Sequence, residues 1–243
     1  MTNVLFLDFD GVICDSVNEC FVSSWIAFHD RYRGDSPRAV GLDIYAKFRS
    51  LRPFIRTGQD FLVVQELISE GLSVGSQAEF DAAADRAGQE KLATFDSLLH
   101  AVREDLIANN PDYWLPLHRP FGSLAGPLRA AARSPSVWIV STKRPELIGR
   151  ILHYWQIDWV AGRIVFPVRR TKIDAIKSIM RRYGHSRGVF VDDQQDHLRC
   201  EPGIGLECRL AEWAHRGVGA VLPPGVERIG LDELCELVGS FGS

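Results

Sequence analysis

Long apolar runs, an excess of basic residues and paired cysteine motifs are all missing from this 243-residue sequence. Its five cysteines are odd in number and form no CxxC pair, which argues against a zinc site or a disulfide framework and suits a reducing compartment. The apolar start, Val4 to Leu7, is too short for a signal peptide, and no run reaches the roughly 18 residues that span a membrane. The net charge is −3, with no basic stripe for nucleic acid. We therefore expect a soluble, cytoplasmic protein with neither a nucleic-acid nor a membrane partner.

The composition, 46% hydrophobic and 24% charged, is that of a folded protein with a full core. Several apolar runs have the length of strands and are typical of a parallel sheet that helices cover on both faces. These runs are NVLFL (3–7), SVWIV (136–140), RIVF (163–166), GVFV (188–191) and GVGAVL (217–222). Helix-like segments at 144–156, 172–184 and 231–241 alternate with them. This alternation predicts a doubly wound, Rossmann-like α/β fold with a parallel sheet.

The segment from residue 15 to about 124 has helical spacing and few strand signals. Its longest stretch, 78–110, is acidic and rich in alanine, and predicts a long amphipathic helix that Gly88 can break. No repeat or low-complexity linker separates this segment from the rest. We therefore predict a discontinuous α/β core domain, residues 1–14 and 125–243, with an α-helical cap domain inserted at 15–124.

Polar residues follow the predicted strands at the edge where parallel sheets bind their ligands. Four carboxylates in one cleft repel one another unless a cation is present, and Mg²⁺ is a hard cation that carboxylates and substrate phosphate hold. Hydroxyls, lysines and the backbone N–H groups of a turn bind phosphate, and an aspartate can attack phosphorus while a neighbouring carboxyl protonates the leaving oxygen. This set therefore indicates phosphoryl transfer with Mg²⁺. Its members are Asp8, Asp10, Gly11, Ser141, Thr142, Lys172, Asp192 and Asp193.

Four motifs resemble, in their order and strand context, the successive motifs of the haloacid dehalogenase superfamily of hydrolases. They are FLDFDGVICDS (6–16), IVSTKRPEL (139–147), TKIDAIK (171–177) and VFVDDQQD (189–196). The resemblance implies that Asp8 is the nucleophile and forms an aspartyl-phosphate. It implies that Asp10 is first the general acid and then the base, and that its backbone carbonyl joins the Mg²⁺ shell. Dehalogenases and phosphonate-cleaving members lack the second aspartate, so its presence favours phosphate esters.

The resemblance also implies how the phosphoryl group and the metal are held. Ser141 and Lys172 would hold the phosphoryl oxygens, although a shift of one residue would give Thr142 the place of Ser141. Asp193 would bind the metal directly with the support of Asp192. The usual fourth motif is Gly-Asp with another acid four or five residues beyond, whereas here the pair is Asp-Asp.

The third acid of this motif and its neighbour leave two questions open. Asp196 lies three residues beyond Asp193, so either Asp192 or Asp196 can support the metal. His197 comes directly after these acids, and we interpret it as a hydrogen-bonded or exposed bystander rather than as an extra base.

The predicted cap carries Arg49, Arg52 and Arg56 in a stretch that Pro53 and Gly58 punctuate. These arginines could close over an anionic substrate, or they could form a solvated helix face. The sequence therefore predicts an Mg²⁺-dependent phosphomonoester hydrolase that acts on a small phosphorylated metabolite. A phosphomutase that uses the same aspartyl-phosphate, and a non-catalytic binding protein on the same scaffold, are the alternatives.

Overall fold

The computed structural model describes residues 3–34, 41–199, 203–214 and 222–242. The chain divides into two compact units: Met1–Asp15 with Arg119–Ser243, and Ser16–His118. The chain leaves the first unit and returns to it through two short antiparallel strands, β2 (Cys14–Asp15) and β3 (Arg119–Pro120). Because β2 and β3 pair, Asp15 and residues 119–124, predicted as the two ends of the helical insertion at 15–124, fall within the α/β unit.

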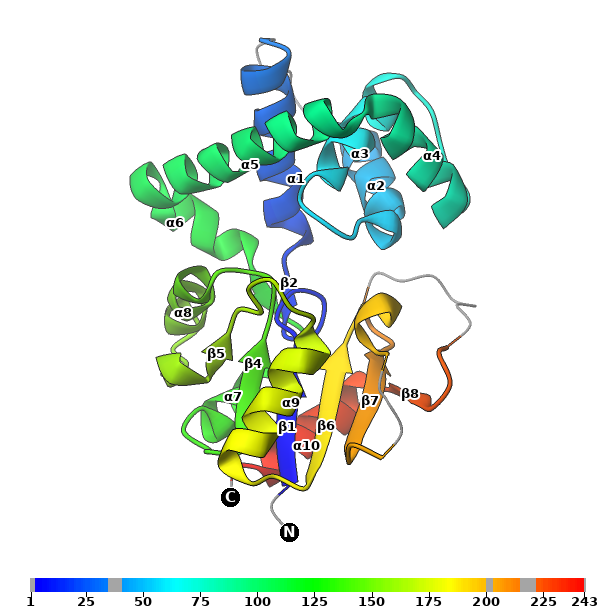
Figure 1. Ribbon diagram of the computed structural model, residues 1–243. Helices are drawn as coiled ribbons and strands as arrows, with labels where there is room; N and C mark the ends of the chain where they lie inside the picture. Colours follow the sequence, from blue (N-terminus) through cyan, green and yellow to red (C-terminus); the bar gives the residue numbers. More distant parts are fainter. Residues whose placement is uncertain (1–2, 35–40, 200–202, 215–221, 243) are drawn as a thin grey trace. The chain divides into compact units, whose positions relative to one another are not determined.

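The α/β unit contains a six-stranded sheet in the order β5-β4-β1-β6-β7-β8, and every neighbouring pair is parallel (Figure 1). Strand β1 lies inside the sheet between β4 and β6, and four of its five residues are buried. The strands are β1 (Asn3–Leu7), β4 (Val137–Val140), β5 (Ile164–Val165), β6 (Arg187–Asp192), β7 (Leu206–Ala211) and β8 (Val226–Ile229). The predicted α/β class is therefore confirmed.

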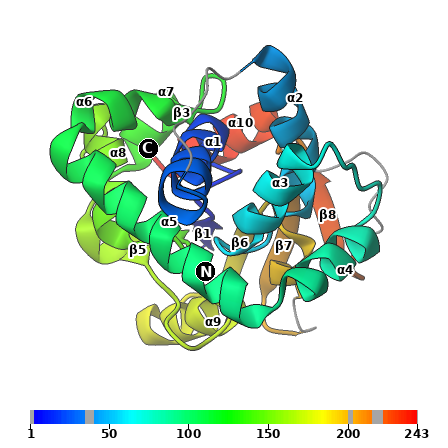
Figure 2. The ribbon, with the colours of Figure 1, turned by 90° about the horizontal axis from the view of Figure 1, so that it is seen from above.

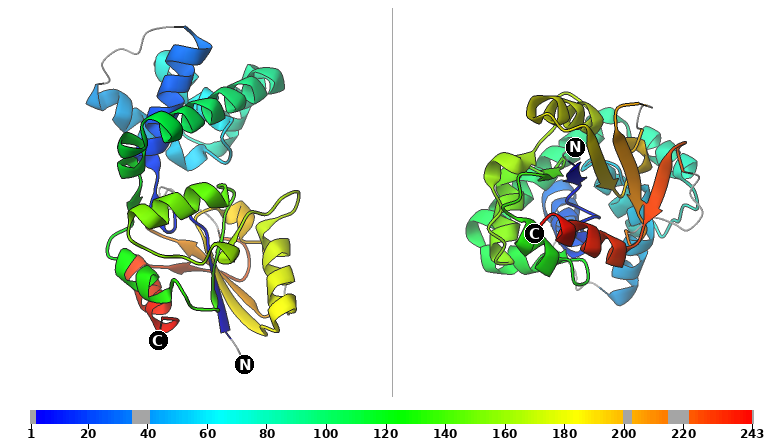
Figure 3. Two further views of the ribbon diagram at one scale, coloured as in Figure 1. Left: turned by 90° about the vertical axis from the view of Figure 1, so that its left-hand side faces the viewer. Right: turned by 90° about the horizontal axis from the view of Figure 1, so that it is seen from below.

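Helices cover the two faces of this sheet (Figure 3). Helix α9 (Lys172–Tyr183) lies on one face, where Ile176 and Met180 pack in one core with Phe6 and Phe190 of the strands. Helices α7 (Ala125–Ala131) and α10 (Leu231–Ser240) lie together on the other face. Helix α8 (Pro145–Tyr154) follows β4, and the 3-10 turns η4 (Ala161–Arg163) and η5 (Gln195–His197) lie in the connecting loops. The sheet therefore has the buried environment that its apolar runs predict.

Two strands at one edge of the sheet differ from the prediction. Strands β7 and β8 carry exposed charged residues among their buried apolar ones, so they lack the continuous apolar run that marks a central strand. The strand predicted at 217–222 lies, apart from Leu222, outside the described residues.

The other unit is helical, and its longest helix packs against other helices of the unit (Figure 2). The break predicted in the stretch 78–110 is confirmed, because Gly88, with φ of 82°, separates α4 from α5. Helix α5 contacts α1, α3 and α4. The segments are α1 (Val17–Ile26), the π-helix η1 (Ala27–Tyr32), α2 (Leu42–Leu51), η2 (Arg52–Phe54), α3 (Asp60–Ser69), α4 (Gln77–Ala87), α5 (Gln89–Asn109), α6 (Pro111–Trp114) and η3 (Leu115–Leu117).

A buried ion pair joins α1 to α5 inside the helical unit. Glu19 is fully buried and accepts two hydrogen bonds from Arg103, from Nε at 2.7 Å and from Nη2 at 3.0 Å. The hydroxyl of Ser23 and the indole N–H of Trp114 also donate to Glu19 Oε1, at 2.7 Å and 3.4 Å. A buried carboxylate needs such partners, so these contacts stabilise the packing of the two helices.

The cysteines depart from the sequence expectation at one position. Cys14, Cys20 and Cys235 are free thiols, whereas Cys208 in β7 is disulfide-bonded. Disulfide formation depends on which residues the fold brings together, and spacing along the chain does not show this. Within the described part of the chain, no helix combines the length and the apolar character needed to cross a membrane.

Candidate active site

The predicted motifs meet at one edge of the parallel sheet. Leu7 pairs with Ile139 of β4 and with Val191 of β6, so the residues that follow these three strands leave the sheet side by side. Asp8 follows β1 and Ser141 follows β4, while Asp192 ends β6. This is the edge where open parallel sheets bind their ligands.

The first turn of α9 places Lys172 at this edge. Thr171 caps the helix by accepting a hydrogen bond from the backbone N–H of Asp174 at 3.1 Å, and the Asp174 side chain accepts one from the backbone N–H of Thr171 at 3.3 Å. This reciprocal capping box fixes where the helix starts. Lys172 is therefore the first helical residue, and its side chain is 2% exposed.

The ammonium group of Lys172 lies between two buried carboxylates. Its Nζ is 2.9 Å from Asp8 Oδ1 and 2.7 Å from Asp192 Oδ2. Asp8 is 5% exposed and Asp192 is fully buried. Because charges removed from water need partners, the lysine compensates both carboxylates in this interior.

Burial and neighbouring charges shift the pKa values of these groups. Burial, with help from Asp192 and Asp193 and against the effect of Lys172, raises the pKa of Asp8 to about 7. Burial alone would raise the pKa of Asp192 as well, but Lys172 and His197 outweigh it and hold that pKa at about 2. Burial would lower the pKa of Lys172, and the two carboxylates raise it above its ordinary value instead. Near neutral pH, therefore, Asp192 and Lys172 are charged and Asp8 is poised between its two forms.

Three buried carboxylates form a group that suits a divalent cation. Asp8, Asp192 and Asp193 each offer an oxygen, and these oxygens lie within 4.8 Å of one another. Oxygen ligands of this kind suit Mg²⁺. Asp196 lies outside the group, because it is half exposed and pairs with Arg199 at 3.3 Å. Of the two acids that the sequence leaves open as metal support, the structure brings Asp192 into the cluster.

Gly11 makes room for one of these carboxylates. Its φ of +91° belongs to the left-handed region that favours glycine, and a Cβ built there would lie 2.5 Å from Cγ of Asp193. The backbone N–H of Gly11 donates to the carbonyl oxygen of Cys14 at 2.9 Å. In this conformation Gly11 therefore leaves space for the Asp193 carboxylate, and its N–H donates to Cys14 rather than to a phosphate.

Asp10 forms an ion pair with a lysine that the prediction from the motifs did not include. Lys143 Nζ lies 3.0 Å from Asp10 Oδ1, and the ammonium group also sits 6.0 Å from the centre of the Phe9 ring. Lys143 is only two residues beyond Ser141, in the same motif after the same strand. This position is the signal that could have identified Lys143 as a residue of the site. The pair holds the carboxylate that is predicted to transfer protons.

Ser141 and Thr142, the two candidates for the phosphate hydroxyl, have different surroundings. Ser141 is 2% exposed and its Oγ accepts a hydrogen bond from the backbone N–H of Lys143 at 3.3 Å. Thr142 is exposed and lines a pocket of about 610 Å³. Both therefore stay candidates, Ser141 as a buried hydroxyl and Thr142 as an exposed one in the lining of the pocket.

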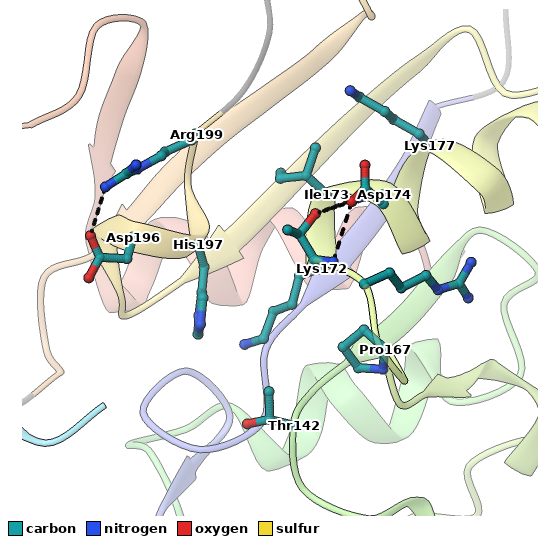
Figure 4. A pocket seen from close by; sticks show the side chains of 11 residues that line it. Thr142, Pro167, Lys172, Ile173, Asp174, Lys177, Asp196, His197 and Arg199 are labelled. Carbon is teal, nitrogen blue, oxygen red and sulfur yellow. Dashed lines mark hydrogen bonds and ion pairs between the residues drawn. The ribbon is translucent and has the colours of Figure 1, made fainter. Parts of the chain in front are cut away.

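The same pocket also contacts the buried lysine and a histidine (Figure 4). Lys172 and His197 point toward the same space, with Thr142 opposite them, and Arg199 pairs with Asp196. His197 Nδ1 lies 3.2 Å from each oxygen of Asp192. This contact matches the hydrogen-bonded alternative of the sequence interpretation and identifies the buried carboxylate of Asp192 as the partner.

The three arginines of the helical unit have separate environments within that unit. Arg49 lies over the ring of Tyr45, with its guanidinium carbon 5.9 Å from the ring centre. Arg52 is buried in η2, and Arg56 forms an ion pair with Asp81 at 3.0 Å. Their predicted role in binding an anionic substrate stays a prediction.

Neither the family models nor the curated proteins give a match to this sequence. Solved structures do match. A haloacid dehalogenase-like hydrolase from Streptococcus pneumoniae is 14% identical with a TM-score of 0.61, and the match covers 98% of each chain. A structure described as a predicted phosphoglycolate phosphatase from Haemophilus somnus is 11% identical with a TM-score of 0.62 over 96% of each chain. A haloacid dehalogenase family hydrolase from Deinococcus radiodurans, with bound phosphate and sodium, is 14% identical with a TM-score of 0.55, over 98% of this chain and 96% of that one. The chain therefore has the fold of the haloacid dehalogenase-like hydrolases, as the motifs predict.

Proposed function

We propose that this protein is a phosphoric monoester hydrolase that acts on a small phosphorylated metabolite through a covalent intermediate on Asp8. The observation that carries the proposal is the Lys172 ammonium group shared between the buried carboxylates of Asp8 and Asp192, with Asp193 in the same cluster. The fold shared with haloacid dehalogenase-like hydrolases and phosphatases supports the same class of reaction.

Mg²⁺ is the proposed cofactor. Asp8 and Asp193 are the carboxylates that would hold it, because Asp192 already accepts hydrogen bonds from Lys172 and from the backbone N–H of Gln194 at 2.7 Å. When bound, Mg²⁺ would neutralise charge on the transferring phosphoryl group.

In the first proposed step, an oxygen of Asp8 attacks phosphorus and the bond to the ester oxygen breaks. Asp10, which must hold a proton at this stage, gives it to the departing alkoxide, so the alcohol leaves neutral. Lys172 stabilises the negative charge that gathers between Asp8 and the phosphoryl oxygens. A pKa of about 7 for Asp8 means that the metal-free nucleophile is partly protonated at neutral pH, so a second cation would favour its reactive form.

In the second step, a water molecule attacks the phosphorus of the aspartyl-phosphate and Asp10 accepts its proton. The P–O bond to Asp8 breaks, which releases inorganic phosphate and restores the carboxylate. The contact between Lys143 and Asp10 keeps the carboxylate of this acid and base in a defined position before the substrate arrives.

Phosphate release measured with Mg²⁺ over a panel of phosphorylated sugars, nucleotides and small acids, phosphoglycolate among them, tests this function. The wild type should release phosphate from at least one ester, and Asp8→Asn, which keeps the shape of the side chain, should release none. Full activity of Asp8→Asn would overturn the mechanism. Inactivity of the wild type over the whole panel would favour a binding protein, and a requirement for a bisphosphate would favour a mutase.

A further inference from the structure

The loop after β6 folds back around the carboxylate of Asp192. The backbone N–H of Gln194 donates to Asp192 Oδ1 at 2.7 Å, and the turn η5 closes as the backbone N–H of His197 donates to the carbonyl oxygen of Gln194 at 3.0 Å. This turn returns the His197 side chain to the carboxylate five residues before it. The loop conformation therefore places the imidazole on Asp192.

The contact fixes the direction of the hydrogen bond. Asp192 already accepts hydrogen bonds from the Lys172 ammonium group and from the backbone N–H of Gln194, and a carboxylate paired with an ammonium group can only accept, so Nδ1 of His197 is the donor to the Asp192 oxygens, both at 3.2 Å. The opposite ring nitrogen, Nε2, is then on the side of the imidazole away from Asp192. The side chain of His197 is 27% exposed and lines the pocket beside Lys172, so Nε2 is within reach of the pocket (Figure 4).

Asp192 in turn sets the position of the lysine. Its Oδ2 is 2.7 Å from Lys172 Nζ, the shorter of the two contacts that hold this ammonium group between Asp192 and Asp8. A fully buried carboxylate with fewer donors would rotate or draw the lysine toward itself, because unpaired charge in the interior is costly. Any such movement would shift Nζ relative to the Asp8 nucleophile.

We propose that His197 is a positioning residue, whose Nδ1–H holds Asp192 so that the Lys172 ammonium group stays between Asp192 and Asp8. This role rests on the proposed function, since it concerns the lysine that would stabilise the phosphoryl group. His197 acts through Asp192 and does not touch the reacting atoms.

Replacing His197 by the two amides separates its two nitrogens. Asparagine places its Nδ2–H₂ near the position of the histidine Nδ1 and keeps a donor for Asp192, whereas glutamine places its Nε2–H₂ near the position of the histidine Nε2. His197→Ala removes both donors. His153→Asn, on the exposed part of α8, is the matched control.

Two readouts are measured for each variant: hydrolysis of p-nitrophenyl phosphate with Mg²⁺, and binding of inorganic phosphate to the metal-free protein by calorimetry. We expect kcat to fall about tenfold or more in His197→Ala and His197→Gln, the loss that removal of a partner of a site carboxylate typically causes. His197→Asn and the His153→Asn control should stay within about threefold of the wild type. Phosphate affinity should follow the same order.

Three results would overturn the positioning role. Activity retained in His197→Gln but lost in His197→Asn would mean that Nε2 contacts the substrate. Wild-type behaviour of all three His197 variants would mean that the contact has no functional effect, and equal loss in all three would mean that the Nδ1 donor is not what matters. If the wild type hydrolyses no ester, the hydrolase proposal fails, while the phosphate-binding series still decides the role of His197.

Discussion

Replacing Gly11 with alanine should weaken metal binding more than it weakens the fold. The backbone at this position has φ of +91°, and a residue with a Cβ in that region costs about 1–2 kcal/mol. The new methyl group would also lie 2.5 Å from Cγ and 3.0 Å from Cβ of Asp193, well inside the contact distance of about 3.5–4.0 Å between carbon atoms. The Asp193 carboxylate must therefore move out of the acidic cluster.

The control is Gly184→Ala at the C-terminal end of α9. Gly184 also has a positive φ, +72°, but no atom lies within 4 Å of the Cβ that alanine would add. This variant therefore carries the same backbone strain without displacing a carboxylate. We expect it to lose about 1–2 kcal/mol of unfolding free energy and to keep the full effect of Mg²⁺.

Urea unfolding with and without Mg²⁺ is the assay. At about 100 times its Kd, Mg²⁺ should stabilise the wild type by about 2.7 kcal/mol, and a hundredfold loss of affinity in Gly11→Ala would reduce this increment to about 0.4 kcal/mol. An increment in Gly11→Ala equal to that of Gly184→Ala would show that the space which Gly11 leaves for the Asp193 carboxylate does not affect metal binding.

Three further changes test other parts of the structure. Lys143→Met should lower kcat for an alkyl phosphate at least about tenfold more than it lowers kcat for p-nitrophenyl phosphate, because the alkoxide leaving group needs the proton of Asp10. Equal losses of kcat with both esters would contradict the role of Lys143 in holding Asp10. The pKa of Asp8 is raised to about 7, so the contribution of this carboxyl to the unfolding free energy of the metal-free protein is full below about pH 4 and is lost as the pH rises through about 7. Urea unfolding in EDTA should therefore show a larger fall in stability between about pH 5 and about pH 8 for the wild type than for Asp8→Asn, and identical slopes would contradict the shift. In the helical unit, Arg103→Met removes the cation that faces the buried Glu19 carboxylate and should cost about 3–5 kcal/mol in urea unfolding, while Glu19→Gln in the same chain should recover part of that loss. No recovery in the double variant would show that the charge of Glu19 is not the cause.

The central strands could be predicted from sequence because burial on both faces leaves a continuous apolar run. Strands β1, β4 and β6 all coincide with such runs. Strands β7 and β8 interrupt theirs with Glu207, Arg209, Glu227 and Arg228, which are polar positions that a strand near a sheet edge can leave in water. A search for continuous apolar runs therefore misses them.

The helical insertion shows the same difference between local and long-range information. Gly88 breaks the helix through a backbone preference of one residue, so the sequence could predict it. The return point of the chain at Arg119 depends on pairing with Asp15, more than a hundred positions earlier. Helical spacing near residue 124 does not report that pairing.

Motif spacing was enough to bring Asp8, Lys172 and Asp192 to one edge, because parallel strands align their carboxyl ends. The contacts of Lys143 with Asp10 and of His197 with Asp192 could not be predicted in this way. These contacts depend on the conformations of loop side chains. Hydrogen bonds that form only in the folded chain, such as that from Gln194 to Asp192, determine those conformations.

The central claim is that Asp8 attacks phosphorus, and trapping the covalent intermediate tests it most directly. The wild type would be mixed with Mg²⁺ and the best substrate of the panel, quenched with acid during turnover, digested and examined by mass spectrometry. If Asp8 is the nucleophile, a phosphoryl group should be found on the peptide that contains Asp8, and none in Asp8→Asn. Turnover with the phosphoryl group on another residue, or an Asp8→Asn variant that still turns over, would contradict it.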